Sequence, residues 1–396
     1  MDIDKLLTEL VHKGGSDLHL KVGAPPIMRK KTKLCTLSSD LPIINNHTID
    51  QLIAPILTDN YQEQLREYGS VDLGYGLKGI GRFRFNIFFQ RGSIRVAVRH
   101  IPHNVPLFND LNLPMEILNI VNKAERGLIL VTGATGVGKS TTLAAIINHI
   151  NKTKNKHILT IEDPIEFLIQ DHHSLITQRE MGVDCYDPHL ALKSALRQDP
   201  DIILFSELRT KDVISTALTA AETGHLIFST IHTQEAAETI NRILSVFSSV
   251  EQQSVRLVLS SVLKAVFAQR LIPKKDGTGY IPAMEILINN YRVQKEIEKQ
   301  HSSTEQIRKI MTESKNHWGM QTFDQHLIEM MKQKLISKRD ANRFSTSAEK
   351  IKLISSGISF ENQFEKYMNQ SAPEQITKTQ DISSTGLSLK TKTNAS

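Results

Sequence analysis

The chain has 396 residues, of which 40% are hydrophobic and 23% are charged, as in a folded globular protein of two or three domains. Its formal net charge of +6 comes from 48 Lys and Arg against 42 Asp and Glu, an excess too small and too dispersed to indicate a nucleic-acid-binding protein. The two cysteines, Cys35 and Cys185, are far apart and outside any C-x-x-C pattern, which argues against a disulfide framework and a structural zinc site.

The start of the chain carries no recognisable targeting signal. Residues 1–5 are acidic where a secretory signal would be basic, and no stretch approaches 18 consecutive apolar residues. We therefore expect a cytoplasmic protein with no direct membrane insertion, which reaches a membrane only through a partner.

Residues 1–105 predict an α+β domain. Apolar spacing indicates helices over 2–11 and 48–68. Alternating or glycine-bounded runs indicate strands over 16–22, 71–77, 81–90 and 93–100. Because the last three strands are separated by glycine turns, the sheet is expected to be mainly antiparallel.

The strand over 81–90 carries arginines at alternate positions. Arg82 and Arg84 fall on one face and Phe83 and Phe85 on the other, because side chains alternate along a strand. One interpretation is a solvated strand face over an aromatic core. The other is a row of fixed cations that meets the phosphates of a nucleotide bound elsewhere, as an arginine finger does in trans.

Residues 133–140 fit the pattern G-x-x-x-x-G-K-[ST] at every fixed position. An apolar run over 127–132 precedes the pattern, and a helical apolar spacing over 141–150 follows it. Glycines let backbone N–H groups wrap an anion, and the helix N-terminus adds partial positive charge. We expect Lys139 to reach the β- and γ-phosphates of ATP and Ser140 to hold Mg²⁺.

A linker over 106–113 leads into a second domain over 114–289, in which strands and helices alternate. That order predicts a parallel sheet with crossover helices, whose ligand groups lie at the carboxyl ends of strands. The expected elements are a short helix over 114–122, strands over 127–132, 157–161, 201–205 and 225–231, and helices over 188–197, 211–222, 236–247 and 255–269.

The rest of the chain is expected to be helical and then disordered. A hairpin-like segment over 280–288 precedes a helical region over 290–369, and the Ser/Thr/Lys-rich tail over 370–396 is expected to be disordered. Helices are indicated over 290–299, 304–314 and 320–334.

Carboxylates follow two strands of the second domain. Glu162 and Asp163 come after the strand over 157–161, where they either cap a turn or orient the waters of a bound metal. Glu207 ends the apolar segment that begins at Asp201, a form typical of a Walker B segment. Because a carboxylate there is costly unless it serves a cation or a water, we expect it to polarise the attacking water.

Two histidines bracket the strand over 225–231. His225 precedes it and His232 follows it. Each is interpreted either as a satisfied polar group at a strand end or as a γ-phosphate sensor or subunit contact.

These motifs together resemble the hexameric ATPases of secretion systems and type IV pili, and most of all the twitching-motility retraction branch with its PilT and PilU types. The segments that carry the resemblance are 133–142 (Walker A), 158–167 (Asp box), 197–204 with Glu207 (Walker B), and 218–226 with 230–233 (His box). At the front end, 16–20, 81–86 and 99–102 resemble that branch's PAS-like domain, and 319–324 resembles its C-terminal helical region.

The resemblance implies a PAS-like α+β domain followed by a RecA-like P-loop ATPase domain. It implies a homo-hexamer that hydrolyses ATP with Mg²⁺ and removes pilin from the base of a type IV pilus. Its partners would be an inner-membrane platform protein and a paralogous retraction ATPase. The implied nucleotide-binding residues are Gly133, Ala134, Thr135, Gly136, Val137, Gly138, Lys139, Ser140 and Thr141. The implied catalytic residues are Glu207, Glu162, Asp163, His225, His232 and, in trans, Arg82 and Arg84.

Three departures refine the resemblance. Ser206 and Thr210 stand where the Walker B segment of the family has Gly and Asp. The Ala-Ile-Arg-Asn-Leu-Ile motif of the PilT type is absent from 291–297, which favours the PilU type. The two distant cysteines cannot build the four-cysteine zinc site of assembly ATPases.

Two alternative functions remain open at this level. Ser206 and Thr210 motivate a weakly active or regulatory subunit bound to a main retraction ATPase. A related secretion-system ATPase, including a DNA pump suggested by the basic charge balance, is the other.

Overall fold

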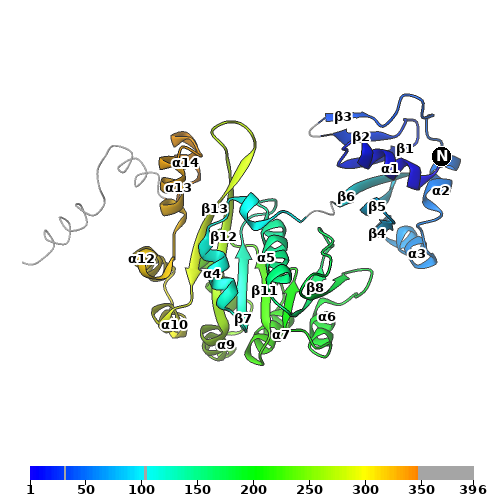
Figure 1. Cartoon of the computed structure of the whole chain (residues 1–396). Helices are drawn as coiled ribbons and strands as arrows, with labels where there is room; N and C mark the ends of the chain where they lie inside the picture. The colour runs from blue at the N-terminus through cyan, green and yellow to red at the C-terminus, as the bar shows by residue number, and fades with distance from the viewer. Residues whose placement is uncertain (31–32, 102–104, 347–396) are drawn as a thin grey trace, which may run out of the picture. The chain divides into compact units, whose positions relative to one another are not determined.

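The computed structural model describes residues 1–30, 33–101 and 105–346 (Figure 1). These residues form two separate β-sheets, each with its own hydrophobic core and its own helices. None of the helices in this part of the chain is both long and apolar enough to span a bilayer. The expected disordered tail over 370–396 lies outside the described residues.

The first sheet has six strands in the order β3-β2-β1-β6-β5-β4, and every neighbouring pair is antiparallel. Its strands are β1 (Asp17–Lys21), β2 (Ile27–Lys30), β3 (Lys33–Thr36), β4 (Ser70–Leu77), β5 (Gly81–Gln90) and β6 (Ser93–Ile101). Its helices are α1 (Ile3–His12), α2 (Asn46–Ile53) and α3 (Asp59–Tyr68). The antiparallel sheet is as predicted.

The single helix predicted over 48–68 is wrong, because the segment folds as α2 and α3. Pro55 stands between them. Its ring leaves no backbone N–H to donate to the carbonyl oxygen of Gln51, so the helical hydrogen-bond series is interrupted and α2 ends at Ile53.

The alternation predicted along β5 is present. Phe83 and Phe85 are fully buried in the core with the apolar faces of α1 and α2. Arg82 and Arg84 are partly exposed on the opposite face. Both earlier interpretations of the arginines required this placement.

The second sheet has seven strands in the order β13-β12-β7-β11-β10-β8-β9. All neighbouring strands are parallel except β12 and β13, so the α/β fold class is confirmed. The strands are β7 (Gly127–Thr132), β8 (His157–Glu162), β9 (Leu175–Glu180), β10 (Ile202–Phe205), β11 (Leu226–Ile231), β12 (Leu263–Pro273) and β13 (Tyr280–Ile288).

Helices connect these strands and complete the core. They are η1 (Phe108–Leu111), α4 (Met115–Lys123), α5 (Lys139–Thr153), α6 (Pro188–Ala195), α7 (Lys211–Glu222), α8 (Ala236–Leu244) and α9 (Ser249–Val262). The 3₁₀ helix η1 falls within the segment predicted as a linker. Phe108 and Leu113 of that segment are buried in the core of the second sheet, which ties the segment to it.

The helix predicted over 255–269 is wrong in its second half. Helix α9 ends at Val262, and the next residues form β12 between β7 and β13. Residues 265–268 of β12 are all fully buried. A continuous apolar run does not distinguish a buried strand from a buried helix, and here strand pairing decides the conformation.

Up to residue 346, where the described part of the chain ends, five helices follow the second sheet. They are α10 (Tyr291–Glu298), α11 (Thr304–Glu313), α12 (Lys315–Trp318), α13 (Phe323–Lys332) and α14 (Lys338–Phe344). Helix α13 packs against β13 and α14 against β12 (Figure 1). The helical character predicted for this region is present in the residues described.

Candidate functional site: a phosphate-binding pocket

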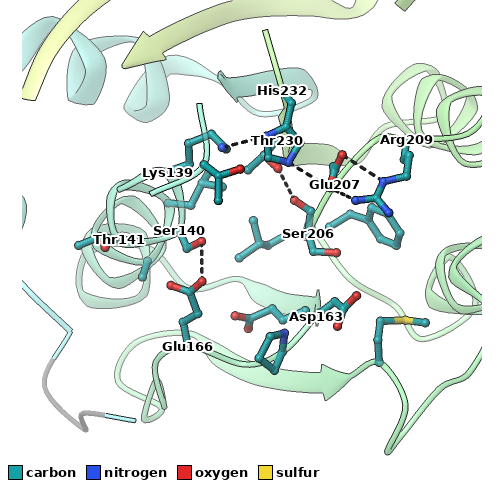
Figure 2. Close-up of a pocket in the computed structure, with 18 of the residues that line it drawn as sticks. Lys139, Ser140, Thr141, Asp163, Glu166, Ser206, Glu207, Arg209, Thr230 and His232 are labelled. Atoms are coloured by element: carbon teal, nitrogen blue, oxygen red, sulfur yellow. Dashed lines mark hydrogen bonds and ion pairs between the residues drawn. The ribbon is translucent and has the colours of Figure 1, made fainter. Parts of the chain in front are cut away.

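A pocket of about 610 Å³ opens at the carboxyl ends of the parallel strands of the second sheet (Figure 2). It contains residues from the loop after β7, the segment after β8 and the ends of β10 and β11. Among its lining residues are Thr135, Gly136, Gly138, Lys139, Ser140, Thr141, Glu162, Asp163, Glu166, Ser206, Glu207, Arg209, Thr210, Thr230 and His232. The topology therefore brings most of the predicted site residues together.

The glycine loop over 133–138 joins β7 to α5 in a conformation that needs glycine. Gly138 has φ +90°, and α5 begins at the next residue. A Cβ atom at Gly133 would lie 2.5 Å from the carbonyl oxygen of Gln269, so a side chain cannot fit there. The loop thus ends at a helix N-terminus that faces the pocket, as an anion site requires.

Lys139 is buried and extends back over the loop. Its Nζ donates to the carbonyl oxygens of Gly133 at 2.9 Å and Ala134 at 3.1 Å. Burial lowers the pKa of Lys139, while the charges of Glu207 and Glu166 act in the opposite direction. A bound polyanion would favour the charged lysine, so the residue is suited to a phosphate ligand.

Ser140 donates a hydrogen bond to Glu166, with 3.1 Å between Oγ and Oε1. The sequence analysis gave Glu166 no role, although it lies four residues after Glu162 in the same Asp-box segment. A further carboxylate within the segment that resembles the Asp box was the signal that could have revealed it. Figure 2 shows Glu166 and Asp163 along one side of the pocket.

Glu162 and Asp163 occupy different environments despite being adjacent. Glu162 Oε1 accepts hydrogen bonds from Thr160 Oγ1 at 2.7 Å and Gln178 Nε2 at 3.0 Å. Burial raises the pKa of Glu162 in spite of these bonds. Asp163 is exposed at the pocket. Of the two carboxylates, Asp163 is therefore the more accessible to solvent and ligand.

His232 connects the lysine of the glycine loop to the strand-end carboxylate. Its Nδ1 lies 3.4 Å from Lys139 Nζ, and its Nε2 lies 3.3 Å from Glu207 Oε2 (Figure 2). A protonated lysine has no acceptor, so Nδ1 accepts and Nε2–H donates to Glu207. Arg209 Nη2 contacts the same Glu207 oxygen at 3.1 Å.

The other predicted histidine is not in the pocket. His225 directly precedes β11 and His232 directly follows it, so the two are seven positions apart in the sequence. Because a strand rises about 3.3 Å per residue, the two histidines lie roughly 23 Å apart, at opposite ends of β11. His225 Nδ1 contacts the carbonyl oxygen of Ala220 at 3.1 Å. A phosphate-sensing role for His225 in this pocket of its own chain is therefore wrong, whereas a role as a subunit contact stays a prediction.

The predicted arginines also lie outside the pocket lining. Arg82 Nη2 pairs with Glu180 Oε2 at 2.6 Å, and Arg84 Nε pairs with Asp72 Oδ1 at 3.4 Å. Their expected action was on a neighbouring subunit, so it stays a prediction.

The donor set around Ser140 fits a metal ion that arrives with phosphates. Within the described ranges, no group of three or more His, Cys, Asp or Glu side chains could hold a metal alone. Mg²⁺ in phosphoryl-transfer sites takes one or two protein ligands and completes its shell with phosphates and water. Ser140 with the nearby carboxylate Glu166 provides that kind of partial site.

A glycine loop after a buried strand, a lysine over that loop and a strand-end glutamate in one pocket define a P-loop ATPase. The family model described as type II/IV secretion system protein matches residues 91–364, more than half of the chain. The chain belongs to this family.

Curated relatives cover nearly the same length. The chain is 41% identical over 341 residues to the type IV pilus retraction ATPase PilT of Pseudomonas aeruginosa, covering 86% of this chain and 97% of that protein. It is 36% identical over 354 residues to the type IV pilus ATPase PilU of the same organism, covering 89% and 91%. The retraction-type resemblance is thus confirmed, while the preference for the PilU type stays a prediction.

Solved structures agree with this assignment. The pilus retraction motor PilT with bound ADP matches with a TM-score of 0.81 and 39% identity, covering 88% of this chain and 98% of that one. The ATPase DotB of Legionella pneumophila matches with a TM-score of 0.74 and 27% identity, covering 90% and 95%. The predicted ATPase activity and fold are therefore confirmed.

Proposed function

We propose that this chain is a hexameric motor that uses ATP hydrolysis to retract a type IV pilus. The motor would work on the cytoplasmic side of the inner membrane, held there by a platform protein of the pilus machine. The observation that carries the proposal is the His232 ring, which contacts both Lys139 and Glu207. Both groups that a hydrolytic cycle needs are thereby linked through one side chain.

The proposed hydrolysis follows from the positions of these groups. Glu207 accepts a proton from a water molecule whose oxygen attacks the γ-phosphorus, while the bond between that phosphorus and the β,γ-bridging oxygen breaks. Lys139 and the N-terminus of α5 stabilise the negative charge that develops on the phosphate oxygens. Mg²⁺, held by the phosphates and Ser140, would supply further neutralisation of that charge.

His232 gives this pocket a way to sense its contents. When phosphate oxygens replace the carbonyl oxygens of Gly133 and Ala134 as acceptors for Lys139, the contact between Lys139 and His232 changes. Because the same imidazole holds Glu207, the carboxylate responds to the arrival or loss of the terminal phosphate. Such coupling is what a motor needs if its conformation is to follow the state of its nucleotide.

Replacing Glu207 with Gln tests the proposal. The variant should bind ATP but lose turnover by at least about 100-fold, because the amide cannot accept the proton. Glu222→Gln, an exposed change at the end of α7, is the matched control and should leave turnover intact. Wild-type protein without Glu207-dependent turnover would favour the alternative of a regulatory subunit, which Ser206 and Thr210 motivate.

In cells, deleting the gene should leave long, unretracted pili and abolish surface motility. The Glu207→Gln variant, supplied in place of the wild type, should restore neither pilus retraction nor motility. Cells without pili would contradict retraction and indicate assembly instead.

A role for Arg84 in trans predicts that Arg84→Gln and Glu207→Gln subunits, each inactive alone, regain turnover when mixed in one ring. Mixed rings that stay inactive would contradict that role.

A further inference from the structure

Gln269 reaches from β12 to the glycine loop of the pocket. Its side chain is almost completely buried, with 3% of the residue exposed. Nε2 donates a hydrogen bond to the carbonyl oxygen of Val137 at 2.7 Å. Oε1 accepts one from Thr142 Oγ1, also at 2.7 Å. The amide therefore joins the loop to the first turns of α5, across more than 125 residues of sequence.

The backbone of Gln269 also lies against the loop. A Cβ atom at Gly133 would lie 2.5 Å from its carbonyl oxygen, and one at Gly138 would lie 3.1 Å from its Nε2. One residue of β12 thus contacts the start, the end and the following helix of the loop. Two of the glycines in the motif have their space limited by this single residue.

We propose that Gln269 is a positioning residue that holds the glycine loop in its phosphate-binding shape. In a trans peptide the C=O and N–H groups point in opposite directions. By holding the carbonyl of Val137, Gln269 turns the N–H of Gly138 in the direction away from its own side chain. Gly138 lines the pocket, so this N–H is presented on the side where a phosphate would lie.

Glutamine is the residue type that this position needs. The carbonyl of Val137 requires a donor, and the hydroxyl of Thr142 meets an acceptor. A glutamate would place an oxygen without a proton against the Val137 carbonyl and add a negative charge beside the phosphate site. A methionine of similar size would leave that carbonyl without its partner. Both changes should weaken phosphate binding, and glutamate should weaken it more.

The inference rests on nucleotide binding at this loop, so its test measures affinity without hydrolysis. MgADP binding to full-length Gln269→Met and Gln269→Glu is measured by calorimetry beside the wild type. We expect affinity to fall at least tenfold for Met and further for Glu. In steady-state assays the KM for ATP should rise by a similar factor while kcat changes less than threefold, since the positioned group acts on binding.

Gln321→Met provides the matched control. Gln321 is also buried, at 7% exposed, and donates from Nε2 to the carbonyl oxygen of Met284 at 3.0 Å, away from the loop. Its loss should lower the melting temperature without changing the affinity for MgADP. Equal losses of affinity in the Gln269 and Gln321 variants would overturn the proposal, because they would report general destabilisation.

A second variant covers the case in which the Gln269 variants do not fold. Thr142→Val removes only the hydroxyl that Gln269 accepts from, and it should weaken MgADP binding about threefold. If Gln269→Met folds and binds MgADP with wild-type affinity, the proposal is overturned. If only Thr142→Val folds, wild-type affinity in that variant overturns it. A wild-type protein that binds MgADP but does not hydrolyse ATP would contradict the proposed function. The comparison of MgADP affinities between the wild type and the variants would still test the role of Gln269.

Discussion

The phosphate-binding pocket and a second charged cluster contain residues that are close in sequence. They differ in whether their charged side chains have ionic partners within the protein. In the pocket, Lys139 donates to two carbonyl oxygens and contacts the ring of His232, and none of these groups is a carboxylate. It forms no ion pair with another residue among those described. Within the described part of the chain, the cation is therefore buried without a carboxylate in contact, although Glu207 and Glu166 lie near enough to favour its charged form, and phosphate oxygens could take the place of the carbonyl oxygens as acceptors.

The second cluster, which we call the inner charge cluster, consists of Glu235, Arg270, Glu285 and Arg308. Glu235 pairs with Arg308 and lies 3.7 Å from Arg270, and Glu285 accepts the backbone N–H of Ala236 at 2.7 Å. These residues come from β12, β13, α11 and the start of α8.

The difference shows how position along the chain separates function from structure. Glu235 follows His232 by three residues, and Arg270 directly follows Gln269. One residue of each pair serves the pocket, and the other joins the C-terminal helices to the sheet. In the pocket, Lys139 has no carboxylate in contact among the residues described and is available to a ligand, whereas in the inner charge cluster Glu235 contacts both Arg270 and Arg308 within the protein.

The largest expected effect comes from removing the cation of Lys139. Lys139→Met should lower the affinity for MgATP by about a thousandfold, because charge-assisted bonds to phosphate oxygens are lost. Lys156→Met is the control, since Lys156 pairs with Asp201 and Glu125 before β8, at the opposite edge of the sheet. Calorimetric titration should show that only the first variant loses affinity. Retained affinity in Lys139→Met would contradict the assignment of Lys139 as a ligand-binding charge.

A pH dependence is the next effect in size, and it belongs to the inner charge cluster. Burial raises the pKa of Glu285 to about 7, although the N–H of Ala236 and the two arginines oppose this. The native state then binds the proton more tightly than the unfolded state. Stability from this group is present below pH 4.5 and is lost as the pH rises to 7, by up to about 3 kcal/mol.

Glu285→Gln should therefore gain stability relative to wild type between pH 5 and pH 8 in urea unfolding. Glu296→Gln is the contrast. Burial raises the pKa of Glu296, but hydrogen bonds from Lys299 and Ser303 outweigh it and leave the pKa lowered. Its replacement should reduce stability at neutral pH, with the loss fading as the pH falls through the carboxyl range. Parallel pH profiles for the two variants would show that the Glu285 carboxyl is not in the environment described.

The smallest effect should come from opening one ion pair of the inner charge cluster. Arg308→Met leaves Glu235 with the more distant Arg270, and it should lower the free energy of unfolding by about 2 kcal/mol, because Arg308 is partly exposed. Arg292→Met, which breaks an exposed pair with Glu313, should cost less than about 1 kcal/mol. Turnover per folded molecule should stay at the wild-type level. Equal losses of unfolding free energy in the two variants would contradict the prediction that the Arg308–Glu235 pair contributes more than the exposed pair.

Much of the site could be predicted because its signals are local. The glycine pattern over 133–140, the strand before it and the carboxylate at Glu207 each occupy a short segment whose meaning does not depend on distant residues. The rule that ligands gather at the carboxyl ends of parallel strands then brings Glu207 and His232 to the same edge. The same rule, applied to the direction of β11, would have placed His225 at the other edge.

The sequence by itself determined the loop that binds phosphate, the alternation of strands and helices, and the polar residues that end those strands. Only the tertiary structure decided that residues 263–273 form a strand, that Glu166 contacts Ser140, and that Gln269 holds the loop from more than 125 residues away. Burial of an apolar run and pairing of polar groups depend on which segments meet in space. Local periodicity carries no information on contacts between distant segments, so these features could be identified only in the tertiary structure.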